Sequence, residues 1–230
     1  MAKSRIELSK YLADVWQLLS ESERNLLASD VYKENFKNGD IIYLEDDEPK
    51  DLMCLLEGKV KIFKNGIGGR TQIIRMIRPV QYFGYRAYFA KEKYVTSASS
   101  VEKSTVCFIP MKTVEEIARK NGDFALFFVN LLSVDLGIAD ERVVSLTQKH
   151  IRGRLAESLI FLKESYGLEE DGATINIYLA REDLANLSNM TTSNAIRTLS
   201  IFTNERIIAM DGRKIKIIDE DRLRKISRIG

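Results

Sequence analysis

The stretch over residues 179–218 constrains the fold of this chain more than any other segment. Apolar residues at helical spacing predict one helix over residues 181–188 and a second over residues 192–204. The tight turn between them contains Asn189, and asparagine tolerates the left-handed backbone that such a turn requires. Asp-Gly at residues 211–212, between two short apolar runs, then predicts a two-stranded hairpin. Helix, turn, helix and hairpin in this order present the second helix to the major groove of DNA.

The second helix of this pair carries the predicted DNA-reading surface. Ala195, Leu199 and Phe202 share one apolar face, while short hydroxyls and one arginine lie on the opposite face. Two helices and a turn alone would fit any small helical domain, but the hairpin and this polar face favour DNA binding. The predicted DNA-contact residues, hairpin tip included, are Arg181, Thr191, Thr192, Ser193, Ile196, Arg197, Ser200, Arg213 and Lys214.

Positive charge is concentrated at the C-terminal end of the chain. The whole chain carries a formal net charge of +2, which argues against a protein that coats nucleic acid without specificity. Residues 190–230 contain nine Lys or Arg against five acids, a local net charge of +4. Such a modest local field suits phosphate contact by a sequence-specific reader, although an ordinary charged surface would look similar.

Composition restricts the other classes of protein. The chain has 230 residues and 45% apolar residues, enough for one large domain or two ordinary ones. We expect no membrane partner, because no run of about 18 uninterrupted apolar residues occurs, and no secretion, because the N-terminus lacks an apolar signal core. Cys54 and Cys107 both lie in apolar β-like runs, so we expect core thiols in a reducing cytoplasm rather than a disulfide.

Short β-like runs occupy residues 31–110. They recur about every ten residues, over residues 40–43, 52–56, 59–63, 71–77 and 106–109, with glycine-containing turns between them. This spacing predicts a small barrel or roll, whose interior is a candidate ligand cavity. Before this region residues 1–30 favour helix.

A long helix is predicted over residues 123–149. Apolar residues recur along it at alternating steps of four and three, which is typical of a coiled-coil seam. A second apolar strip lies beside the seam, so one strip can cover the roll while the other meets the same helix of a second copy. Burial of both strips within one chain is the alternative. The predicted dimer-interface residues are Val129, Leu132, Leu136, Ala139, Val143 and Leu146.

The order of roll, long helix and winged helix-turn-helix resembles the CRP/FNR family of bacterial transcription regulators. The resemblance rests on FKNGDII at residues 36–42, on residues 52–62 with EGK, and on YFG at residues 82–84. It implies an α+β protein with a β-roll (double-stranded β-helix, jelly-roll-like) sensor domain of the cyclic-nucleotide-binding type. The implied divisions are a sensor domain over residues 1–121, a dimerisation helix and hinge over 122–149, and a winged helix-turn-helix domain over 150–230. It also leaves RNA polymerase open as a partner.

Departures from the family pattern affect the expected effector. Members that bind cyclic AMP have a glutamate after the glycine of the phosphate-binding cassette, whereas this chain has Tyr85 after Gly84. They also have an arginine before a Ser-Ala or Thr-Ala pair, whereas this chain has Thr96. The adenine-contacting Thr-Ser pair of the long helix corresponds to Ala139-Asp140. We therefore expect an effector other than cyclic AMP, or none. Residues 85 and 86 could line a cavity for another anion, or Arg86 could simply be exposed. The effector-site candidates are Gly84, Tyr85, Arg86, Thr96, Ser97, Ala139 and Asp140.

The recognition helix departs from the family too. Familiar members begin this helix with an Arg-Glu pair, whereas this chain has Thr192-Ser193, with Arg197 at the matching later position. We therefore expect an operator that differs from the family's best-known palindrome.

Other chemistries find little support in the sequence. Two cysteines cannot supply an iron–sulfur cluster of the family, and the single histidine, His150, falls at the hinge rather than in the roll, so no haem, metal or other cofactor is expected. No nucleotide-binding Gly-Lys-Ser/Thr loop or credible triad occurs, so we expect no enzyme. The expected function is a cytoplasmic homodimer that binds double-stranded, roughly palindromic DNA. The alternative is a sensor module whose C-terminal domain binds a protein.

Overall fold

The computed structural model describes residue 9 and residues 11–229, and it divides into two compact units. The first unit comprises residues 1–64 and 74–137, and the second comprises residues 65–73 and 138–230. The α+β class and the order of β-roll, long helix and winged helix-turn-helix are confirmed. The expected boundaries near residues 121 and 149 stay a prediction, since the division by contacts falls inside the long helix.

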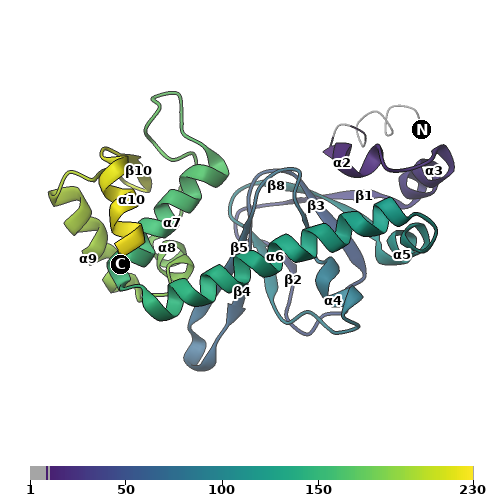
Figure 1. The fold of residues 1–230 in the computed structure, drawn as a ribbon, viewed down its shortest axis with the longest axis horizontal. Coiled ribbons are helices and arrows are strands. Elements are labelled where there is room, and N and C mark those ends of the chain that lie inside the picture. The colour runs from purple at the N-terminus through teal and green to yellow at the C-terminus, as the bar shows by residue number, and fades with distance from the viewer. Residues whose placement is uncertain (1–8, 10, 230) are drawn as a thin grey trace. The chain divides into compact units, whose positions relative to one another are not determined.

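Two four-stranded sheets form the roll of the first unit (Figure 1). One sheet has the order β1-β8-β3-β6 and the other β2-β7-β4-β5. The strands are β1 (Tyr32–Phe36), β2 (Ile41–Tyr43), β3 (Asp51–Glu57), β4 (Val60–Asn65), β5 (Thr71–Ile77), β6 (Tyr82–Phe83), β7 (Ser97–Ser100) and β8 (Ser104–Pro110). The turn between β4 and β5 contains a short 3-10 helix, Ile67–Gly69.

Strand β3 is buried on both faces, which explains its continuous apolar run. Successive side chains of a strand point to opposite faces of the sheet. Met53 and Leu55 therefore face the interior of the roll. Leu52 and Cys54 face a second core outside the roll, and Cys54 lies directly opposite Cys107 of β8. Both cysteines are buried and free, as expected.

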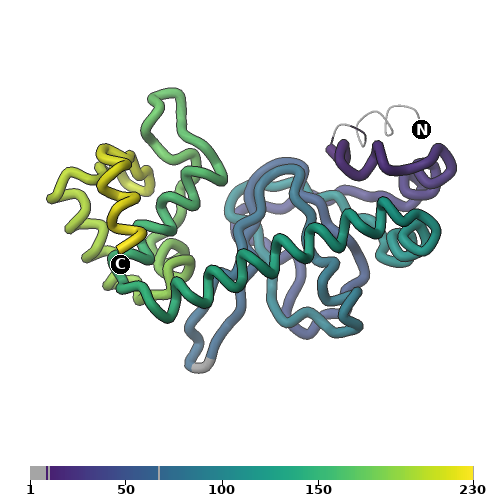
Figure 2. Tube along the Cα trace, viewed as in Figure 1, coloured from purple at the N-terminus to yellow at the C-terminus, as the bar shows by residue number. Residues whose placement is uncertain are grey.

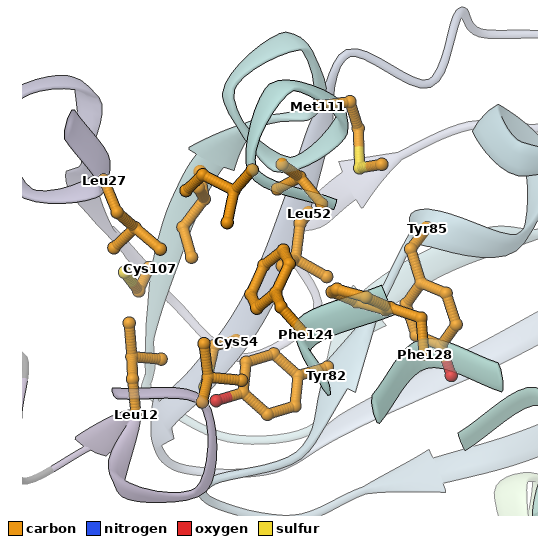
Figure 3. Packing of buried hydrophobic residues seen from close by; sticks show 14 of the residues in the cluster. Leu12, Leu27, Leu52, Cys54, Tyr82, Tyr85, Cys107, Met111, Phe124 and Phe128 are labelled. Atoms are coloured by element: carbon orange, nitrogen blue, oxygen red, sulfur yellow. The ribbon is translucent and has the colours of Figure 1, made fainter. Parts of the chain in front are cut away.

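Helices cover the outer face of this sheet. The elements concerned are α2 (Ala13–Trp16), α3 (Glu21–Asp30), α5 (Met111–Lys120) and the first turns of α6 (Gly122–Gln148), together with α4 (Tyr85–Phe89). Figure 3 shows Met111 of α5 and Phe124 of α6 beside Leu52 of β3, with Leu27 of α3 and Leu12, the residue before α2, on the side of the same cluster where Cys54 and Cys107 lie. Part of the helix expected over residues 1–30 falls on residues 1–8 and 10, which lie outside the described residues.

The second unit contains the C-terminal helices and a small hairpin. Its helices are α7 (Ile151–Tyr166), α8 (Arg181–Leu187), α9 (Thr192–Asn204) and α10 (Glu220–Ile229), and its hairpin is β9 (Ile208–Asp211) with β10 (Lys214–Ile217). Residues 65–73, which lie at the end of the hairpin formed by β4 and β5, also belong to this unit. Figure 2 shows the course of the chain along the β4–β5 hairpin.

Candidate nucleic-acid interface and roll site

The turn before α9 is built as its sequence predicts. Asn189 has a φ of 50°, the left-handed conformation that asparagine tolerates better than most residues. The hydroxyl of Thr191 then accepts a hydrogen bond from the backbone N–H of Asn194 at 3.2 Å, which caps α9. Ala195, Leu199 and Phe202 are fully buried beneath the helix. One face of α9 is thus anchored, and the opposite face is presented to solvent.

The exposed face of α9 is short-chained and largely polar. It consists of Thr192, Ser193, Ile196, Arg197 and Ser200. The Arg197 guanidinium donates to the Asn194 side-chain oxygen at 3.0 Å, which orients it along the helix. The Ser200 hydroxyl donates to the Ile196 carbonyl at 3.0 Å, so its oxygen is left to accept from another donor. Such a surface can approach base edges closely because no long acidic side chain stands in the way.

Arg181 begins α8, as expected, and its side chain contacts the β9–β10 hairpin. Its guanidinium donates to the Gly212 carbonyl at 2.5 Å and contacts the Met210 sulfur at 3.5 Å, both in the β9–β10 hairpin. Burial, and then the charge of Arg213, lowers the pKa of Arg181. Arg181 therefore supports the β9–β10 hairpin, which is the wing of the winged helix-turn-helix. The expected contact of Arg181 with a DNA phosphate stays a prediction.

The two basic residues of the wing tip differ in their surroundings. The Lys214 ammonium lies 3.2 Å from the Glu169 carboxylate and 5.1 Å from the centroid of the Tyr178 ring. Arg213 is exposed at the tip itself. Among these two, Arg213 is better placed for a phosphate, since Lys214 must first leave its carboxylate partner.

The roll site is built around a glycine that requires left-handed backbone. Gly84 has a φ of 87° and caps the short helix α4. A Cβ atom there would lie 2.3 Å from Met53 Cε and 3.2 Å from the Asp51 carbonyl oxygen. Tyr85, the next residue, is buried, and burial raises its pKa.

A three-residue cluster links this site to α6. The Tyr85 hydroxyl donates to the Asp135 carboxylate at 3.0 Å, and the Arg75 guanidinium lies 2.6 Å from the same oxygen. Neither Arg75 nor Asp135 was predicted from the sequence. The α6 residues predicted for this site, Ala139 and Asp140, are both exposed in the second unit. The contact from α6 to the cassette is therefore made by Asp135, about one helical turn earlier.

The remaining roll candidates have partners within the protein. Ser97 accepts a hydrogen bond from the Glu45 backbone N–H at 2.9 Å, and it is buried. Thr96 bonds the Tyr43 hydroxyl, and Tyr43 stacks on Tyr94 with ring centroids 3.9 Å apart. Arg86 is exposed and pairs with Glu92 at 3.3 Å. Arg86 thus lies on the exposed side of α4, and its expected part in an effector site stays a prediction.

Helix α6 exposes much of its apolar surface. Val129 is 55% exposed, Leu136 63% and Val143 61%, while Ala139 is exposed and Leu132 and Leu146 are half-buried. The second apolar strip is buried only at its N-terminal end, where Phe124 and Phe128 pack into the core beside the roll; farther along α6, Val134 and Ile138 are each 55% exposed. By length and composition α6 could also cross a membrane: an 18-residue window has a mean hydropathy of 1.6 and is 11% buried. We did not expect this from the sequence, and helices of proteins without a membrane pass the same test.

No group of three or more histidine, cysteine or acidic side chains that could hold a metal ion occurs within the described part of the chain. Cys54 and Cys107 lie in the core, and burial raises the pKa of both thiols. Neither cysteine is placed to act as a ligand or nucleophile at the surface.

A roll of this type joined to a winged helix-turn-helix defines a class of DNA-binding regulators with a sensor-like domain. Residues 33–121 match the model of the cyclic nucleotide-binding domain, and residues 153–226 match that of the Crp-like helix-turn-helix domain. The chain belongs to the CRP/FNR family of transcription regulators.

Relatives and solved structures span most of this chain. A CRP-like cAMP-activated global transcriptional regulator of Mycobacterium tuberculosis is 21% identical over 94% of this chain and 97% of its own. The anaerobic regulatory protein of Bacillus subtilis is 26% identical over 83% of this chain and 84% of its own. The structure of FixK2 from Bradyrhizobium japonicum has a TM-score of 0.77 at 20% identity and covers 85% of this chain and 96% of that one. These structural similarities concern the fold.

Proposed function

We propose that the chain is a homodimeric, sequence-specific DNA-binding transcription regulator. Two α9 helices, one from each copy, would enter successive major grooves of a roughly palindromic site. Arg197 and the hydroxyls of Thr192, Ser193 and Ser200 would contact bases or phosphates, and Arg213 would contact the backbone beside them. A cytoplasmic location, the absence of enzymatic activity and contact with RNA polymerase belong to the same proposal.

The exposed face of α9 is the observation that carries this proposal. Its buried side is tied to the core through Ala195, Leu199 and Phe202, so the helix is rigidly held. Its free side offers one guanidinium among short side chains, with Arg197 already oriented by Asn194. A guanidinium held in this way can bond a guanine edge with two donors, which is the commonest specific contact to DNA.

Replacement of Arg197 by alanine tests this assignment. Operator sequences are first selected from a random DNA pool with the unmodified protein. We expect R197A to bind its selected operator with about 1–3 kcal/mol less free energy and to lose preference at one base pair of each half-site. Fluorescence anisotropy with systematically substituted operators measures both effects. R119M, on helix α5, removes a surface arginine elsewhere and serves as the control. Unchanged affinity and base preference of R197A would contradict the assignment.

The exposed apolar face of α6 supports the proposed homodimer. An apolar seam that is more than half exposed at Val129, Leu136 and Val143 is unfavourable in water. A second copy of the same helix would cover it as a coiled coil, whose sequence spacing it already has. A lipid surface is the other possible cover, and purified protein that is monomeric in solution and partitions into vesicles would contradict the coiled-coil explanation.

We infer that cyclic AMP is not the effector, and that any effector of the roll is another small molecule. The residue after the cassette glycine, Tyr85, is engaged with Asp135, and Thr96 is engaged with Tyr43. A cyclic phosphate there would lack the arginine that gives charge-assisted bonds. Calorimetric titration with cyclic AMP is expected to give no binding heat, and saturable binding would overturn this inference.

The second candidate is a sensor module whose C-terminal domain binds a protein. Only phosphate contacts release counterions on binding, so a steep fall of affinity with salt supports DNA as the partner. A flat salt dependence would favour the protein partner. The charge of residues 190–230, +4 from nine bases and five acids, favours DNA.

A further inference from the structure

The end of α8 has an unusual set of hydrogen-bond partners. A helix leaves its last four carbonyls without partners inside the helix. The Leu184 carbonyl accepts from the Ser188 N–H and the Ala185 carbonyl from the Met190 N–H, each at 3.0 Å. The next four carbonyls, of residues 186–189, accept hydrogen bonds from side chains that lie outside the helix-turn-helix.

Three side chains from three different segments supply these hydrogen bonds. Gln72, in β5, donates to the Asn186 carbonyl at 2.7 Å. Arg142, in α6, donates to the Leu187 carbonyl at 2.9 Å. Arg154, in α7, donates to the carbonyls of residues 188 and 189 at 3.1 and 3.0 Å. The turn of the helix-turn-helix is thus held by side chains and not only by its own packing.

Gln72 and Arg142 also share an acceptor, the backbone carbonyl of Ile73 in β5. The Arg142 guanidinium donates to the Ile73 carbonyl at 2.6 Å, and the Gln72 amide donates to the same carbonyl at 3.1 Å. All these atoms lie in the second unit. One junction therefore joins the β4–β5 hairpin, the C-terminal half of α6 and the end of α8. Arg142 is half-buried in this junction, and that burial lowers its pKa.

We propose that Arg142, assisted by Gln72, is a positioning residue that sets the angle between α6 and the helix-turn-helix. This proposal rests on the homodimeric DNA-binding function. In such a dimer α6 joins the two copies, so the angle at this junction determines the distance between the two recognition helices. The junction would then select the spacing of the two half-sites without touching DNA.

The physical consequence differs for one and for two half-sites. Binding of the second half-site is an intramolecular step, and its strength depends on the local concentration that the linkage provides. A rigid linkage raises that concentration at one spacing and lowers it at the others. Binding of a single half-site depends on the face of α9 and on Arg213, neither of which the junction contacts.

The experiment compares R142M and Q72M with the unmodified protein and with the control R119M. Q72M keeps the charge of the protein, so it separates the lost hydrogen bond from any change of electrostatic field. Each protein is titrated with the selected operator, with an isolated half-site, and with operators whose half-sites are one to three base pairs closer or further apart. Urea unfolding of each variant measures its stability.

We expect both variants to bind the selected operator about tenfold or more weaker, with half-site affinity unchanged. We also expect a flatter dependence of affinity on half-site spacing and an unchanged salt dependence. R119M should match the unmodified protein.

Three results would overturn the proposal. An equal loss on full and half-sites would mean that the junction only stabilises the fold. A smaller salt dependence in R142M would mean that Arg142 contacts phosphate. Unchanged binding and spacing preference in both variants would mean that these hydrogen bonds have no positioning role. Failure of the unmodified protein to select any DNA would instead refute the proposed function, so the two failures are distinguishable.

Discussion

Ile196 is an apolar side chain in the middle of the exposed and largely polar face of α9. It is 49% exposed, one turn after Ser193 and one turn before Ser200. An aliphatic side chain that enters the major groove can recognise the methyl group of thymine, which protrudes there. We therefore expect the base preference of the protein to depend on a hydrophobic contact by Ile196 as well as on Arg197.

This contact predicts a difference between thymine and deoxyuridine, which lacks the methyl group. Replacing thymines one at a time by deoxyuridine in the selected operator should weaken binding at one position per half-site, by about 1 kcal/mol. In I196A the same replacement should have no effect there. Anisotropy titrations of this two-by-two set measure the coupling. If I196A remains as sensitive to the replacement as the unmodified protein, Ile196 does not read that methyl group.

The buried thiol of Cys107 in strand β8 makes the stability of the folded protein depend on pH. Burial raises the pKa of the Cys107 thiol from 9.0 to about 11. Between these two pH values the folded protein keeps the thiol proton that the unfolded chain releases. The contribution of Cys107 to the unfolding free energy is therefore complete below pH 9 and is lost as the pH rises to about 11. The free energy of unfolding should fall across this range.

The Cys107→Ala variant tests this explanation. Urea titrations between pH 8 and 11 give the slope of the unfolding free energy against pH. We expect this downward slope to be shallower in C107A than in the unmodified protein, by up to about 1.4 kcal/mol per pH unit. Thr105→Ala in the same strand removes no ionisable group and serves as the control. Equal slopes for C107A and the unmodified protein would contradict the role of this thiol.

Helix α6 makes a separate prediction about assembly. Leu136→Glu places a charge in the exposed apolar seam, where a coiled-coil partner would bury it at a cost of several kcal/mol. We expect the dimer dissociation constant to rise about hundredfold or more, while the circular dichroism spectrum stays unchanged. Sedimentation velocity measures the change.

Asn130→Glu provides the matched control for that variant. It adds the same charge on the same helix, at an exposed position about a third of a turn or more from the seam. A dimer equally weakened by both variants, or by neither, would place the interface elsewhere.

Local patterns predicted most of the elements. The Asp-Gly hairpin, the capping threonine and the apolar spacing of α9 are properties of neighbouring residues, and the structure has β9, β10 and α9 where they predict them. Contacts across long separations were not predictable in this way. Asp135 meets Tyr85 across 50 residues, and Gln72 meets the Asn186 carbonyl across 114 residues. No spacing rule relates such pairs, so the role of Arg181 and the α6 contact to the roll had to come from the structure.

At the scale of the whole molecule, the two compact units share α6 and the β4–β5 hairpin, since the division between units crosses both elements. A change in the roll therefore has two covalent routes into the unit that contains α8 and α9. This connectivity suits a regulator in which one element joins two copies and another reaches the end of α8 through Gln72.

Sedimentation equilibrium of the protein with its selected operator measures how many chains bind one duplex. We expect two chains on each duplex that carries two half-sites about one helical turn apart, with an affinity that falls steeply as salt rises. One chain per duplex, or no DNA sequence enriched from the random pool, would contradict the account.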